Sequence, residues 1–149
     1  MELQKETKTS RFESIHQKVV VNVLFTYGWC NDQLKQVVSP YDITIQQFNI
    51  LRILRGQYPN PSTINLLRSR LLDKMSDASR IVDRLVQKEL ALKEMNPDDK
   101  RAVDILISQK GLALLKQMDG EIDLSAMTAS NLTPGEAEML NVLLDKMRG

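Results

Sequence analysis

A stretch near the middle of the chain carries side chains suited to binding a polyanion. Between Ser76 and Arg84, hydroxyl and guanidinium groups recur at a spacing that places them on one face of a helix, and a polar turn with a basic tip follows. Such groups can donate hydrogen bonds to base edges and to phosphates, which is the chemistry of nucleic-acid recognition. The candidate residues are Ser76, Asp77, Ser79, Arg80, Arg84, Lys100 and Arg101.

The first group of candidates lies on a predicted helix, SDASRIVDRLVQKEL. We expect Ser76 to be its N-cap, and Asp77 to favour the positive end of the helix dipole. Apolar residues recur at helical spacing and define an inner face that consists of Ile81, Val82, Leu85 and Val86. The polar side chains then point outward. Taken alone, this helix could equally present an ordinary solvated face.

The second group lies at the tip of a predicted hairpin. After Leu90 the apolar period changes from about 3.6 toward 2, and the segments LALKEMN and RAVDILIS flank an NPDD turn. Pro97 suits the second position of a turn, with Asn96 before it. Because the minor groove of DNA is narrow and electronegative, a basic turn tip is suited to it.

Further helices surround these two elements. Apolar spacing predicts a long amphipathic helix over residues 12–38, ended by Pro40, and a short helix within residues 61–71. Between them, Thr44 and Gln47 form a capping box for a helix that Gly56 and Pro59 stop. After the hairpin we expect one helix over residues 108–127 and a last helix in which Thr133, Pro134 and Glu136 form the start.

Length and composition favour one globular domain. The chain has 149 residues, of which 42% are apolar and 26% are charged, close to the average for globular proteins. The net charge is +1, but from Arg52 to Arg101 eleven basic residues against seven acidic ones leave +4. This basic middle is compatible with a polyanionic partner.

Several classes of protein are disfavoured. No apolar run approaches the roughly 20 residues of a membrane span, and the polar start MELQKETKTSR lacks the apolar region of a secretory signal. We therefore expect a cytoplasmic protein that does not contact a membrane. The single Cys30 has no disulfide partner and no paired Cys/His spacing occurs, so we expect no metal and no cofactor. The sequence also lacks a nucleophile elbow, a phosphate loop and an HExxH helix, and we do not expect an enzyme.

From Ile43 to Gly111 the sequence resembles the MarR family of bacterial transcription regulators. The strings TIQQFNILRIL and SRLLDKMSDASRIVDRLVQKELALKEMNPDDKRAVDILISQKG carry the resemblance. Within them, DRLVQKELAL is similar to the end of the family's recognition helix, and Asp99 and Arg101 match its wing motif of Asp, any residue, Arg. Two positions depart from the family pattern. Glu89 stands where the family commonly has Gly, and Ser108 stands where it commonly has Thr.

The resemblance implies a mainly α fold, namely a winged helix-turn-helix with a two-stranded wing and long terminal dimerisation helices. It implies a single domain over residues 1–149, with a DNA-binding lobe at about 43–108 and dimerisation helices at about 11–38 and 109–148. The expected function is that of a homodimeric repressor that binds a pseudo-palindromic operator in double-stranded DNA.

The resemblance also implies supporting roles for other residues. Asp99 cannot bind DNA itself, and is expected to orient Arg101 or a neighbouring basic group through a charge-assisted hydrogen bond. A small aromatic or phenolic effector is expected to relieve repression, and Tyr27, Trp29 and Phe48 mark its expected pocket. Core packing is the alternative role for these three aromatic residues.

Two alternative functions stay open at this point. The winged helix could serve as a protein-interaction module, although basic residues at positions 80, 84 and 101 favour DNA over a protein partner. The protein could also be a regulator that senses oxidants through Cys30.

Overall fold

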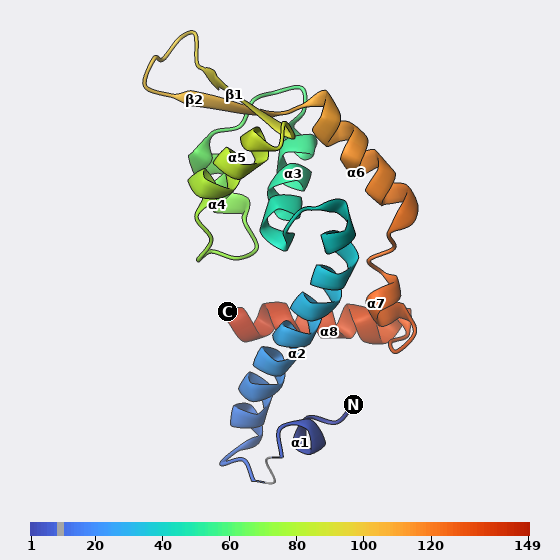
Figure 1. Ribbon diagram of the computed structural model, residues 1–149. Coiled ribbons are helices and arrows are strands. Elements are labelled where there is room, and N and C mark those ends of the chain that lie inside the picture. Colours follow the sequence, from blue (N-terminus) through green and yellow to red (C-terminus); the bar gives the residue numbers. More distant parts are fainter. Residues whose placement is uncertain (9–10) are drawn as a thin grey trace. The chain divides into compact units, whose positions relative to one another are not determined.

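The computed structural model describes residues 1–8 and 11–149, which form two compact units, 1–113 and 114–149 (Figure 1). The first unit contains α1 (Leu3–Glu6), α2 (Ile15–Val38), the 3-10 turn η1 (Ser39–Tyr41), α3 (Ile45–Gln57), α4 (Ile64–Arg70), α5 (Ala78–Gln87), β1 (Ala91–Met95) and β2 (Val103–Ile107). Helix α6 (Gln109–Glu121) begins in the first unit, and the second unit continues with α7 (Ala126–Ala129) and α8 (Pro134–Arg148). The predicted helical chain with one two-stranded hairpin is confirmed.

The core of the first unit forms where α3, α4, α5 and the hairpin pack together. Each element contributes apolar side chains that are at most 2% exposed: Ile50, Leu51, Leu54, Leu67, Val82, Leu85 and Ile105. Burial of one such side chain contributes about 1.5–3 kcal/mol. Helix α5 is therefore held by its inner face, and its opposite face is left to the solvent.

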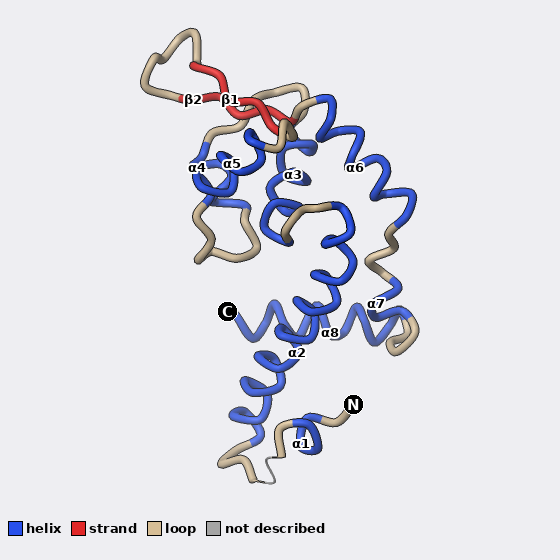
Figure 2. Tube along the Cα trace, in the orientation of Figure 1, coloured by secondary structure: helices blue, strands red, loops and turns tan. Residues whose placement is uncertain are grey.

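The hairpin is antiparallel, with a register that runs from Ala91 opposite Ile107 to Met95 opposite Val103. Its base is buried and its far half is exposed, so the hairpin projects from the core as a wing (Figure 2). Ser62, from the segment before α4, adds a third partner, because it exchanges two backbone hydrogen bonds of 2.8 Å with Ile105.

The end of α5 is a tight left-handed turn that leads into β1. The N–H of Glu89 donates to Val86, and the N–H of Leu90 donates to Leu85, which is the Schellman pattern of helix termination. Glu89 has φ 61°, a conformation that costs a residue with a Cβ roughly 1–2 kcal/mol and that glycine adopts freely. The departure from the family's common Gly at this position therefore leaves the shape of the turn intact.

The start of α6 is packed closely against this turn. The hydroxyl of Ser108 donates to the carbonyl of Glu89 at 2.7 Å and accepts from the N–H of Gly111 at 2.9 Å. A Cβ at Gly111 would lie 2.3 Å from the carbonyl oxygen of Leu90, so only glycine allows this approach. The hydroxyl that Ser108 shares with threonine thus makes both hydrogen bonds of the junction.

Two predicted capping boxes are confirmed. Thr44 and Gln47 exchange side-chain and backbone hydrogen bonds at the start of α3, and Thr133 and Glu136 do so at the start of α8, where Pro134 is the first helical residue. These hydrogen bonds lower the pKa of the Glu136 carboxyl group, the backbone N–H of Thr133 having the largest effect.

Several predicted boundaries were wrong. Helix α2 begins at Ile15 and not at Phe12, because the side chain of Ser14 accepts from the N–H of Gln17 and caps the helix there. Helix α3 continues through Gly56 to Gln57.

The predicted helix over residues 108–127 is interrupted. Helix α6 ends at Glu121, and α7 begins only at Ala126. Asp123 accepts from the N–H of Ser125 at 2.9 Å, a local hydrogen bond that competes with the helical one.

Across the described ranges, 1–8 and 11–149, none of the helices combines the length with the apolar content that a membrane crossing requires.

We predict opposite effects for two buried serines of the first unit. Ser62 is 1% exposed, and within the described residues its hydroxyl has no hydrogen-bond partner. Ser62→Ala should raise the free energy of unfolding by about 1 kcal/mol, because an unsatisfied buried hydroxyl is removed. Ser108→Ala should lower it by about 1–2 kcal/mol, because the cap of α6 is lost. Urea unfolding of both variants measures these changes, and a destabilised Ser62→Ala variant would contradict the first expectation.

Candidate nucleic-acid interface

The outward face of α5 is entirely exposed and carries two free cations. Asp77 is the N-cap, because its carboxylate accepts from the N–H of Arg80 at 3.2 Å. The exposed residues that follow are Ser79, Arg80, Asp83, Arg84 and Gln87. Within residues 1–8 and 11–149, the guanidinium groups of Arg80 and Arg84 make no hydrogen bond or ion pair. Both groups are available to an external anion.

Ser76 has a different role from the predicted one. It lies in the loop before α5, it is half-buried, and its hydroxyl donates to a carboxylate oxygen of Asp73 at 3.1 Å. The prediction that Ser76 is the N-cap was wrong, because the carboxylate of Asp77 accepts from the N–H of Arg80 and Asp73 engages the serine hydroxyl.

The tip of the wing is a turn held by its own polar side chains. The side-chain oxygen of Asn96 accepts from the N–H groups of Asp98 and Asp99 at 2.8 and 3.0 Å, and its amide nitrogen donates to Asp104 at 3.1 Å. The carboxylate of Asp99 accepts from the backbone N–H of Arg101 at 3.0 Å. Asp99 therefore shapes the backbone of the tip, and its hydrogen bond reaches the main chain of Arg101 and not the guanidinium group.

The wing carries charges of both signs. Glu94 lies directly opposite Asp104 in the hairpin register, so this part of the wing is acidic. Lys93 forms an ion pair with Asp83 of α5 at 2.9 Å, which links the wing to that helix. Lys100 and Arg101 are exposed at the tip. In the part of the chain that the structure describes, neither side chain has a partner, and the tip can therefore approach an anion.

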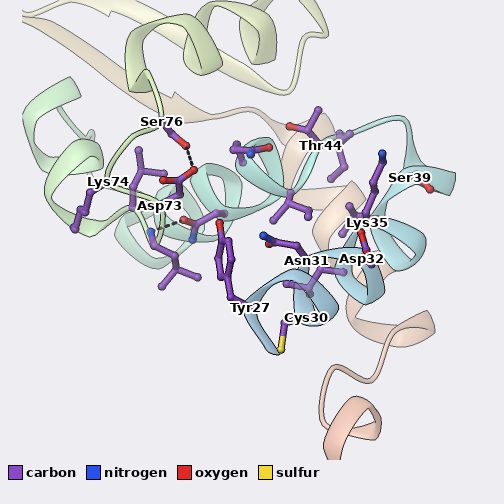
Figure 3. Close-up of a pocket in the computed structure, with 18 residues that line it drawn as sticks. Tyr27, Cys30, Asn31, Asp32, Lys35, Ser39, Thr44, Asp73, Lys74 and Ser76 are labelled. Carbon is purple, nitrogen blue, oxygen red and sulfur yellow. Dashed lines mark hydrogen bonds between the residues drawn. The ribbon is translucent and has the colours of Figure 1, made fainter. Parts of the chain in front are cut away.

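A pocket of about 970 Å³ lies in the first unit, between α2, the segment from Ser39 to Asn49, and the loop from Leu71 to Ser76 (Figure 3). Tyr27 lines this pocket and is 57% exposed, and its part in an effector site stays a prediction. Trp29 and Phe48 are half-buried but are not among the lining residues. Phe48 instead packs under the guanidinium group of Arg52, 5.6 Å from the ring centre. Cys30 also lines the pocket and is half-buried.

Most polar residues of this pocket were not found from the sequence. They come from segments distant along the chain, and include Asn31 and Lys35 of α2 and Asp73 and Lys74 of the loop (Figure 3). The side chain of Asn49 accepts from the N–H of Leu72 at 3.0 Å and so attaches this loop to α3. The loop leads directly into α5, so the pocket wall and the start of α5 are one continuous segment.

Among the described residues, no three histidine, cysteine, aspartate or glutamate side chains are close enough together to hold a metal ion.

Comparison with known proteins places these features in a family. The MarR family model matches residues 43–103. The multiple antibiotic resistance protein MarR of Escherichia coli is 33% identical over 117 residues, which cover 76% of this chain and 79% of that protein. The HTH-type transcriptional regulator MhqR of Bacillus subtilis is 24% identical over 132 residues, which cover 87% and 89%.

The same family appears among solved structures. The structure of a mutant of E. coli MarR complexed with operator DNA matches with a TM-score of 0.75 and 28% identity, and the match covers 99% of each chain. The confirmed order of helices and wing, the family model and the similarity to MarR agree. The chain belongs to the MarR family of transcriptional regulators.

Proposed function

We propose that this chain binds operator DNA as a homodimer and acts as a repressor that a small molecule releases. The observation that carries the proposal is the outward face of α5, where the guanidinium groups of Arg80 and Arg84 are exposed and unpartnered within the described residues. The similarity to MarR, which has been solved with operator DNA, supports the same use of this surface. The proposal assigns regulation and not catalysis to the chain, and places it in the cytoplasm with the DNA.

The residues of α5 differ in what they can contact. A recognition helix contacts base edges mainly through its first turns, where Ser79 and Arg80 lie. Arg84 lies one turn further and is assigned to a phosphate. At the wing, Lys100 and Arg101 are suited to the minor groove, where arginine is favoured. The acidic pair of Glu94 and Asp104 restricts the close approach of the wing to its tip.

Exposed apolar helix faces support a homodimer. On α2, the exposed apolar residues are Ile15, Val19, Val20 and Leu24, and on α8 they are Met139, Leu140, Val142, Leu143 and Met147. Exposed apolar side chains that gather on a helix are typical of interaction sites. We assign these faces, together with α6, to a two-fold interface, because such an interface pairs the same surface on both subunits.

The pocket between α2, α3 and the loop before α5 is the proposed effector site. It is lined by both apolar and polar side chains, Tyr27 among them, which suits a small aromatic or phenolic molecule. Because Leu71 to Lys74 and Ser76 line the pocket and their segment leads into α5, a bound molecule can alter the position of the recognition helix. Trp29 and Phe48 are not assigned to the lining.

The first prediction from this proposed function concerns the cations of α5 and of the wing tip. The DNA for the test is the duplex that the unmodified protein enriches from a random-sequence library, which serves as the operator. Arg80→Ala should reduce discrimination between this operator and random DNA by about 1–3 kcal/mol per half-site, because a base contact is lost. Arg101→Ala should weaken binding to both DNAs, because the contact that is lost depends little on the DNA sequence. The slope of the logarithm of the binding constant against the logarithm of the salt concentration should also become shallower by about 1 per wing. Binding titrations across a salt series measure both effects.

The control for these variants is Lys5→Ala, which removes an exposed cation of α1 and should change neither quantity. Unchanged affinity of Arg80→Ala and Arg101→Ala for both DNAs would contradict the assignment of α5 and the wing, and would favour the alternative of a protein-interaction module.

The second prediction concerns the dimer. The double variant Leu140→Glu with Leu143→Glu should sediment as a monomer at micromolar concentration, because charges would be buried in an apolar interface. Asn141→Glu adds a carboxylate on the opposite face of α8 and should remain a dimer. Sedimentation velocity distinguishes these states, and a monomeric unmodified protein would end the proposal.

The third prediction concerns the pocket. Aromatic acids and phenols that release the operator should change the emission of Trp29, the only tryptophan, which precedes the pocket residue Cys30. Asn31→Phe fills the pocket and should raise the concentration required for release by about tenfold, equal to roughly 1.4 kcal/mol. Gln36→Phe, on an exposed part of α2, is the control. Release with unchanged emission and an unaffected Asn31→Phe variant would locate the effector site elsewhere.

A further inference from the structure

Lys88, at the C-terminal end of α5, directs its ammonium group toward the protein and not toward the solvent. It is the C-cap of α5 and is half-buried. Its Nζ donates to the backbone carbonyl of Asp42, and to the side-chain oxygen of Gln47 at 3.2 Å. Both acceptors are more than 40 residues away along the chain, with separations of 46 and 41. Lys88 therefore links the end of α5 to the corner between α2 and α3.

The two acceptor residues also make hydrogen bonds within the corner. Asp42 follows η1 in a left-handed conformation with φ 56°, and its own N–H donates to the carbonyl of Ser39 at 3.0 Å. Gln47 is only 7% exposed, and the same side-chain oxygen accepts from the N–H of Thr44 at 3.1 Å in the capping box of α3. The ammonium group thus binds two acceptors that are already held in place.

The surroundings of Lys88 do not match those of a cation offered to DNA. Arg80, Arg84 and Arg101 are exposed and unpartnered within the described residues, whereas the Lys88 ammonium is engaged by two neutral acceptors. Hydrogen bonds from a charged donor are stronger than those between neutral groups. The backbone carbonyl of Lys88 is also bound, because it accepts from Nζ of Lys110 at 3.1 Å.

We propose that Lys88 is a positioning residue for operator recognition, which sets the orientation of α5 relative to the end of α2. The inference rests on the proposed function, because that orientation determines where the two recognition helices of a dimer meet the DNA. Half-sites one helical turn apart require a matching separation of the two helices. One additional base pair moves a half-site by about 3.4 Å along the DNA. If α5 is no longer held at its C-terminal end by Lys88, it should tolerate such a change in spacing better than α5 of the unmodified protein.

The test compares three variants on the selected operator, on the same operator with one base pair inserted or removed at its centre, and on random DNA. Lys88→Met keeps the apolar stem and loses the ammonium group. Lys110→Met removes the same charge from a neighbouring exposed position and leaves the link to Asp42 and Gln47 in place. Lys88→Arg keeps a charged donor. Circular dichroism first confirms that each variant is folded at the temperature of the assay.

We expect Lys88→Met to bind the selected operator about tenfold more weakly than Lys110→Met, which corresponds to the loss of one charge-assisted hydrogen bond. Its affinity for random DNA should equal that of Lys110→Met, and its preference for the original spacing should fall. Lys88→Arg should retain most of this preference. In the free protein, hydrogen exchange over residues 42–48 should be faster in Lys88→Met than in Lys110→Met.

Several outcomes would overturn the proposal. Equal losses of Lys88→Met on operator and random DNA, with a reduced salt slope, would make Lys88 a phosphate contact. An unchanged spacing preference, or hydrogen exchange equal to that of Lys110→Met, would remove the positioning role while the proposed function stands. Failure of the unmodified protein to enrich a two-fold sequence would end the proposed function, and this assignment with it.

Discussion

The surface of α5 depends on the apolar core that α5 shares with α3, α4 and the hairpin. Val82 and Leu85 on its inner face are fully buried, and a helix held by one face can expose only the opposite one. The exposure of Arg80 and Arg84 is thus a consequence of core packing. A change in this core would rotate or loosen the surface proposed to bind DNA, even though no core residue reaches that surface.

Two local features, one at the end of α5 and one in α6, lie beside this core. Glu89 adopts a left-handed conformation, and Gly111 allows α6 to approach the carbonyl of Leu90 more closely than any other residue could. Together they direct the chain into the wing and then into α6. The buried residues Leu85 and Leu90, which flank the turn in the Schellman motif, stabilise it and offset the cost at Glu89.

Polar groups in the first unit divide into two kinds. Those that shape loops are bound within the chain, as with Asn96 and Asp99 in the wing tip, Asp73 in the loop before α5, and Asn49 beside the pocket. Those offered to a partner, chiefly the arginines of α5 and the wing, are exposed. The side chains that are hydrogen-bonded within the chain fix the loop conformations before DNA is present. Binding therefore requires a smaller loss of conformational entropy from these loops.

The sequence by itself determined the elements whose signals are local. Helical periods, the two capping boxes and the change of period at the hairpin involve residues only a few positions apart, and they predicted the order of the elements and the cations of α5 and the wing. The cap of α5 is also a local choice, because Asp73 engages the hydroxyl of Ser76 and Asp77 caps Arg80, each three residues away, but the helical pattern does not distinguish Ser76 from Asp77. Only the tertiary structure decided that the pocket excludes Trp29 and Phe48, and that Asn49 binds Leu72 and Lys88 binds Gln47 across 23 and 41 residues. Contacts over such separations depend on how whole elements pack, and no local pattern records them.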